Sequence, residues 1–209
     1  MSSLSPAPSR PLKRFRWRRN KLPTLEQKCM NFVKTSGGDR KTLAAKAKSG
    51  ALERVARGLY WDPVDAEITE NHDLVRVCAA IPNAVICLLS ALQFHHLTTE
   101  WPREVWLAID RQSKIPKSLH LPLRVHHFSK LTLNFGVEEH LLEGIQVRVT
   151  SPEKTVADCF RFRNRYGVDV AVEALRDLLK RRRPIEPLLE AARVCRVEKL
   201  MRLYLEVFL

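Results

Sequence analysis

Positively charged side chains interleaved with aromatic rings dominate the start of this 209-residue sequence. In the stretch LKRFRWRRNK, Phe15 and Trp17 alternate with arginine and lysine. Guanidinium groups pair with phosphates and rings stack on bases or line a groove, so this pattern favours contact with a polyanion over a solvated tail with chance aromatics. The cations that we expect to make this contact are Lys13, Arg14, Arg16, Arg18, Arg19 and Lys21.

A second group of charges falls in SGALERVARGLYWDP, residues 49–63. Two apolar runs, 52–55 and 59–61, flank Arg57-Gly58, which predicts a β-hairpin. So small an element buries little, and its charges therefore either face solvent or meet something negative. We expect Arg54 and Arg57 to lie at phosphates, where they would position the protein rather than read bases.

The charge of the chain is concentrated in its first third. The net charge is +13, yet residues 1–63 hold 15 Lys and Arg against 4 Asp and Glu, while residues 64–209 hold 21 against 19. A basic surface needed only for solubility would not segregate in this way. The segregation indicates a module that docks on a polyanion beside a nearly neutral second domain.

The elements that would position these cations resemble a winged helix. Thr24 and Gln27 form a capping box that predicts a helix running to residue 33, and Gly37-Gly38 predicts a turn. Asp39 can cap a second helix that ends at Gly50, with Lys41 and Lys48 on one side. Two helices followed by a two-stranded wing give a DNA-binding plan, although the same elements could merely cap the neighbouring domain.

The rest of the chain predicts a larger α+β domain. Helices are expected over residues 70–81, 84–97, 152–160, 169–181, 185–194 and 197–208, and strands over 104–109, 123–128 and 144–149. We predict an antiparallel or mixed sheet surrounded by helices. The domain boundaries that follow are a disordered basic arm at 1–22, a winged-helix domain at 23–63 and a larger domain at 64–209.

Catalytic and cofactor motifs are missing from the sequence. It contains no Walker loop, H-E-x-x-H, G-x-S-x-G or G-x-G-x-x-G pattern, so we expect neither a cofactor nor enzymatic activity. The densest acidic group is Glu138, Glu139, His140 and Glu143, which leaves a metal-dependent nucleic-acid-processing site there as the alternative. Scattered cysteines, odd in number, and no apolar run of membrane-spanning length indicate a cytoplasmic protein.

Several blocks of the sequence resemble the AbiEi-type antitoxins of bacterial type IV toxin–antitoxin systems. The resemblance runs from about residue 51 to the C-terminus. It rests on LERVARGLY, HDLVRVCAAIPNAVICLLSALQFHHLT, EVWLAID, LTLNFGVEEH, VRVTSPEKTVADCFRFRNRYGVDVAVEALRD and ARVCRVEKLMRLYLE. Only Arg54, Arg57 and Gly58 of the wing carry over, because fewer helices precede the wing here than in the family.

The resemblance implies two functions. The N-terminal winged helix would bind double-stranded DNA at its own promoter and repress its operon, and the larger domain would act as the antitoxin. The functional partner would be a nucleotidyltransferase-like toxin encoded next door, whose effect is countered without a stable complex. A degenerate paralogue that has lost DNA binding is the remaining alternative.

Overall fold

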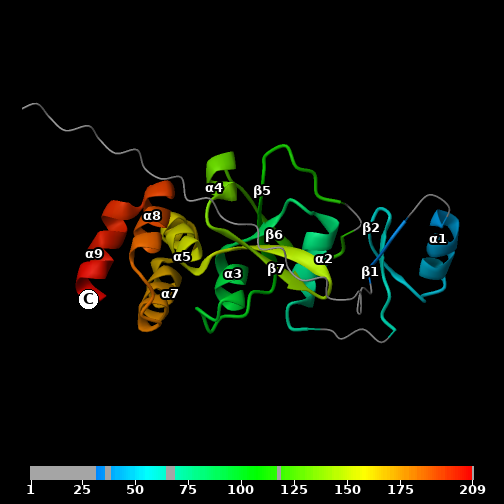
Figure 1. Ribbon diagram of the computed structural model, residues 1–209, viewed down its shortest axis with the longest axis horizontal. Helices are drawn as coiled ribbons and strands as arrows, with labels where there is room; N and C mark the ends of the chain where they lie inside the picture. The colour runs from blue at the N-terminus through cyan, green and yellow to red at the C-terminus, as the bar shows by residue number, and fades with distance from the viewer. Residues whose placement is uncertain (1–31, 36–38, 65–68, 117–118, 209) are drawn as a thin grey trace, which may run out of the picture.

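The computed structural model describes residues 32–35, 39–64, 69–116 and 119–208, and Figure 1 shows their arrangement. The helices are α1 (Arg40–Lys48), α2 (His72–Ala80), α3 (Leu88–Phe94), α4 (Lys130–Asn134), α5 (Pro152–Arg161), α6 (Arg163–Tyr166), α7 (Val168–Lys180), α8 (Glu186–Val194) and α9 (Glu198–Phe208). The strands are β1 (Phe32–Lys34), β2 (Glu53–Ala56), β3 (Leu59–Trp61), β4 (Val85–Ile86), β5 (Val105–Ile109), β6 (Leu123–His127), β7 (Val137–Leu142) and β8 (Ile145–Thr150). The expected α+β class is confirmed.

A mixed five-stranded sheet in the order β6-β5-β4-β8-β7 forms the centre of the molecule. Strands β4 and β8 are parallel, as are β5 and β6, while β4–β5 and β7–β8 are antiparallel. Every residue of β5 is buried, because side chains that alternate along a strand meet a core on each face. The sheet therefore separates two apolar cores.

The first core lies between the sheet and a stack of helices. Trp106 and Ala108 of β5 point into it, where they pack with α3, α5, α7, α8 and α9. Helix α5 starts at Ser151, whose side chain accepts a hydrogen bond from the Lys154 amide, as the Ser-Pro pair predicts. In Figure 1 these helices form successive layers that end at α9, far from α1.

The second core lies on the opposite face of the sheet. Val105, Leu107 and Ile109 of β5 point into it together with buried residues of α2. A small antiparallel sheet in the order β1-β3-β2 closes this core through Phe32, Val55, Leu59 and Trp61. The expected boundary near residue 63 is thus crossed by continuous apolar packing.

The small sheet has both of its faces covered. Leu59 and Trp61 of β3 point toward α2, whereas Tyr60 between them points toward Leu43 of α1 and Leu52. Alternation along a strand explains why three consecutive residues of β3 are all buried. Helix α1 lies outermost, at one end of the molecule (Figure 1).

Two sequence predictions need correction in this part of the chain. The helix expected over 24–33 lies mostly outside the described residues, and its last two positions, Phe32 and Val33, belong to strand β1, which pairs with β3. A winged helix-turn-helix is therefore not established. The long buried helix expected over 84–97 is instead strand β4 followed by helix α3, since an apolar run buried on all sides is compatible with either structure.

A buried ion pair lies inside α5. The Lys154 ammonium contacts the Asp158 carboxylate one turn later, and neither residue has exposed surface. Cys195 donates its thiol to Asp158 at 3.2 Å, and the Phe128 ring lies 5.2 Å from the ammonium. Burial raises the pKa of Asp158, and the ammonium and thiol oppose that effect. The carboxylate is thus held inside the core by an ion pair and a thiol hydrogen bond.

Among the helices of the described residues, none has the length and apolar character needed to cross a bilayer.

We predict that Lys154→Met lowers the free energy of unfolding by about 3–5 kcal/mol, because it leaves a carboxylate buried without its counter-charge. The double variant Lys154→Met/Asp158→Leu is expected to recover most of that loss, since no charge is left in the core. Urea unfolding followed by circular dichroism measures both. A single variant as stable as the wild type would contradict the role given to this pair.

Candidate nucleic-acid interface

Helix α1 forms where the sequence predicts a second helix. The Leu43 amide donates to the Asp39 carbonyl at 2.9 Å, although the Asp39 side chain makes no capping hydrogen bond. At the other end Gly50 has a φ of +78°, and the Ala51 amide reaches back to the Lys46 carbonyl at 3.0 Å. This is the left-handed helix end that glycine favours. Lys41 and Lys48 are both exposed on this helix.

The expected hairpin is confirmed as strands β2 and β3, which are joined by Arg57-Gly58. Gly58 has a φ of +78°, and its carbonyl accepts a hydrogen bond from the Thr35 amide at 2.9 Å. A Cβ at this glycine would lie 2.7 Å from the Thr35 hydroxyl. The turn is therefore fixed against the end of β1, which a residue other than glycine would disturb.

The three charged residues of the hairpin point in different directions. Glu53 lies opposite Trp61 on the face toward α2, where its carboxylate pairs with Arg76. Arg54 lies opposite Tyr60 on the α1 face, and Arg57 lies in the turn. Both arginines are exposed. The alternation of β2 thus places Glu53 on the α2 face, beside Arg76, and Arg54 on the α1 face, and both side chains are exposed.

The described part of the first third leaves a group of cations facing solvent. No ion pair within the described ranges involves Arg54, Arg57, Lys41 or Lys48. Two further exposed cations were not singled out from the sequence, Arg40 and Lys46 of α1. Their position on the same short helix is the signal that would have found them. The surface formed by α1 and the hairpin can therefore pair with phosphates.

The six cations of the arm, Lys13 to Lys21, lie outside the described residues.

The acidic group considered for a metal site is divided among three neighbourhoods. Glu138 contacts His140 at 3.3 Å on one face of β7, while Glu139 accepts from Gln146 on the other. Glu143 lies in the β7–β8 turn and pairs with His72. Within the described ranges no three His, Cys, Asp or Glu side chains gather closely enough to share a metal ion.

The neighbouring histidines of β6 point to opposite faces, as a strand requires. His126 is buried against Trp106, Phe162 and Tyr166, whereas His127 is exposed. Burial lowers the pKa of His126 to about 4, and the charges of Arg165 and Arg124 add to this effect. The imidazole is therefore neutral at physiological pH and acts as part of an aromatic core.

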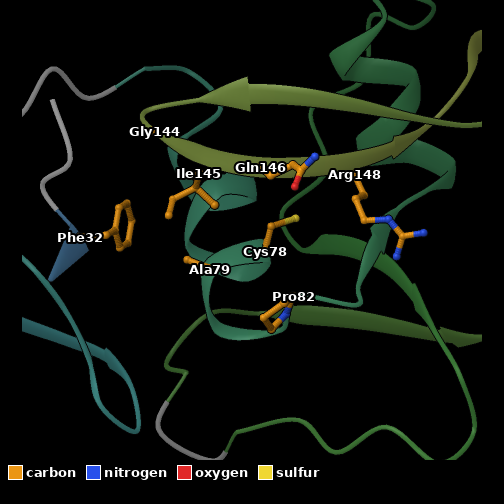
Figure 2. A pocket seen from close by; sticks show the side chains of 8 residues that line it. All are labelled: Phe32, Cys78, Ala79, Pro82, Gly144, Ile145, Gln146 and Arg148. Carbon is orange, nitrogen blue, oxygen red and sulfur yellow. The ribbon is translucent and has the colours of Figure 1, made fainter. Parts of the chain in front are cut away.

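A cavity of about 410 Å³ lies where the small sheet meets the larger one. Figure 2 shows Phe32 of β1 at one end, Arg148 of β8 at the other and Cys78 of α2 between them. Burial raises the pKa of the Cys78 thiol to about 11, which keeps it protonated and unreactive at neutral pH. The described residues of the walls offer apolar contact, the Arg148 guanidinium group and the Gln146 side-chain amide.

Comparison with protein-family models finds no match to this chain, and no curated protein matches it either.

The two left-handed glycines of this region provide a matched pair of variants. We predict that Gly50→Ala costs about 1–2 kcal/mol of stability, which is the usual cost of alanine in a left-handed conformation. No steric cost is added, because no atom lies within 4 Å of the new methyl group. Gly58→Ala is expected to cost about 1 kcal/mol more, since the methyl also meets Thr35. Urea unfolding measures the difference in stability between the two variants. Equal losses would contradict the prediction, because they would show that the Thr35 side chain moves away from the methyl group at no cost.

Glu143 links the β7–β8 turn to the start of α2 and provides a pH-dependent contact. Its carboxylate accepts hydrogen bonds from the Thr69 amide at 3.1 Å and the Thr69 hydroxyl at 2.7 Å, besides that from His72. Burial raises the pKa of this carboxyl, but the hydrogen bonds outweigh burial and the pKa lies below the ordinary value of 4.5. The ionised form therefore stabilises the fold.

We predict that Glu143→Gln lowers the free energy of unfolding by about 1–2 kcal/mol at neutral pH. A folded-state pKa below the unfolded value gives stability that is complete above pH 4.5 and is lost as the pH falls through the lower folded value. The wild type and the variant should accordingly converge in acid. A stability difference that stays constant from pH 7 to pH 3 would refute this account.

Proposed function

We propose that this protein is a DNA-binding regulator that represses its own operon and also serves as the antitoxin of a type IV toxin–antitoxin system. The observation that carries the DNA-binding part is the surface of α1 and the hairpin, where exposed cations lack acidic partners among the described residues while the Glu53 carboxylate is paired with Arg76 of α2. Such a surface carries excess positive potential that the phosphates of a duplex can neutralise.

The rigidity of this surface supports the same proposal. Arg54 and α1 lie on one side of a small sheet whose other side is packed into the core of the larger part. The backbone positions that carry these cations are fixed before binding, so only the side chains have to be ordered on association. We assign Arg54 and Arg57 to phosphate contacts, and Lys41 and Lys48 to the same duplex.

The antitoxin part of the proposal rests on the sequence resemblance to AbiEi-type proteins. The longest resembling block, VRVTSPEKTVADCFRFRNRYGVDVAVEALRD, corresponds to most of β8 and α5 to α7, including the buried Lys154–Asp158 pair. The partner would be a nucleotidyltransferase-like toxin encoded by the neighbouring gene, with no stable complex required. Finding such a reading frame beside this gene would support the assignment.

We predict that the full chain binds a duplex from its own upstream region and that the affinity falls steeply between 50 and 200 mM salt. Arg54→Gln/Arg57→Gln should weaken binding about tenfold or more and reduce the slope of log affinity against log salt by about 2, one unit for each phosphate that is no longer paired with an arginine. Fluorescence anisotropy with a labelled duplex measures both quantities.

The matched control is Arg103→Gln/Arg111→Gln, which removes two exposed arginines from the larger part. It should leave both affinity and slope within twofold of the wild type. Point variants are preferable to deleting residues 1–63, because Phe32, Leu59 and Trp61 help to form the second core and their removal would expose it. Binding that is insensitive to salt would refute the proposal, as would Mg²⁺- or Mn²⁺-dependent cleavage of the nucleic acid that is lost on Glu139→Ala.

A further inference from the structure

A recess with a concentration of positive charge lies at the opposite end of the molecule from α1. It occupies about 410 Å³ between α6 and the turn that joins α8 to α9, and Figure 1 shows α8 and α9 at the end of the molecule away from α1. Four cations line it, namely Arg163 of α6, Arg193 of α8, Arg196 of the turn and Lys199 of α9. Val197 and Leu200 contribute apolar surface.

The recess contains far more positive than negative charge. Glu198 is its one carboxylate, and it is already shared by Arg193 at 3.1 Å and by Arg202, which lies outside the recess, at 2.8 Å. Hydrogen bonds from Arg202 and Arg193 lower the pKa of Glu198, so it is fully ionised at neutral pH. The lining still carries a net charge of about +3, which favours an anionic occupant.

Arg163 is oriented by a hydrogen bond to a neutral group and not by an ion pair. Its Nη1 donates to the carbonyl of Phe160 at 3.0 Å, a neutral acceptor. Neither Arg196 nor Lys199 forms an ion pair with any described residue. One guanidinium is thus pre-positioned, and two further cations at the rim have no protein counter-charge among the described residues.

We propose that this recess binds a small ligand that carries two or more linked phosphate groups, such as pyrophosphate or the diphosphate end of a nucleotide. Arginine pairs with phosphate through two parallel hydrogen bonds, and a diphosphate supplies the two to three negative charges that the recess lacks. The volume lies within the range of small-molecule sites, and the apolar wall can contact the organic part of such a ligand. The four cations converge on one recess, which suits a compact anion better than a long polymer.

The backbone conformation of Arg196 provides a test of this proposal with a matched control elsewhere in the chain. Arg196 has a φ of +61° just after α8, and its amide donates to the Arg193 carbonyl at 3.0 Å. Arg182 has a φ of +49° in the same place after α7, and it does not line the recess. The conformation by itself does not mark a site, since both arginines share it. Glycine suits both positions, so each can be replaced without harm to the fold.

We predict that the full chain binds inorganic pyrophosphate and ADP in isothermal titration calorimetry and that Arg196→Gly weakens both by tenfold or more. Arg182→Gly should leave the affinity within twofold, although both variants keep or raise the melting temperature. Arg196→Lys, which keeps the charge but loses the fork of donors, should fall between the wild type and Arg196→Gly. Equal weakening by Arg196→Gly and Arg182→Gly would overturn the proposal, because it would reduce binding to the general attraction of a basic protein for anions.

A duplex titration on the same variants separates this site from the DNA-binding surface. Arg196→Gly should leave duplex affinity unchanged, while Arg54→Gln/Arg57→Gln should leave pyrophosphate affinity unchanged. A wild type that binds neither pyrophosphate nor ADP at millimolar concentration would refute the site outright. Loss of duplex binding in Arg196→Gly without any pyrophosphate binding would identify the recess as a polynucleotide contact and would refute the small-ligand proposal.

Discussion

Burial of the central sheet on both faces is the constraint on which the other features of this structure depend. Because β4 and β5, at the centre of the sheet, have no face directed to solvent, each side of the sheet must be covered by apolar surface from elsewhere in the chain. One side receives α3, α4, α5, α7, α8 and α9, and the other receives α2 and the small sheet. The small sheet is thus a necessary cover for the second core and also the support of α1.

This double role explains how the charges of the first third are arranged. A sheet that covers a core on one face presents exposed polar side chains mainly from its other face, its edges, its turns and the helix beyond it. Glu53 lies on the face directed to α2 and forms an ion pair with Arg76, whereas Arg54 lies on the face directed to α1. The alternation of β2 therefore separates Glu53 from Arg54, while α1 and the hairpin turn supply the other cations of the basic surface.

Much of this architecture is readable from the sequence, and the failures have physical causes. Strand-like runs predicted the strands at 104–109, 123–128 and 144–149, the last by its alternation, and Gly50 and Gly58 predicted the end of α1 and the hairpin turn, where both have a positive φ. Strand β7 was missed because it lies at a sheet edge, where Glu138, Glu139 and His140 are tolerated and apolar alternation is weak. Strand β4 was taken for helix because burial on both faces removes periodicity.

The candidate sites were only partly predictable for a different reason. Charge segregation identified the basic first third, but the separation of Glu53 from Arg54 depends on the register of β2 with β3, which local patterns do not give. The recess between α6 and the α8–α9 turn gathers residues from three helices, none of which stands out in the sequence by itself. Clusters of this kind become visible only when the packing of the helices is known.

The packing of β3 has a consequence for how this protein can diversify. Tyr60 is held by α1 and its neighbours Leu59 and Trp61 by the second core, so the strand tolerates little substitution on either side. The outer face of α1 and Arg57 in the hairpin turn are exposed and do not pack against either core. Exchange of those outward residues alone would therefore change the charge of this surface and leave the scaffold beneath it intact.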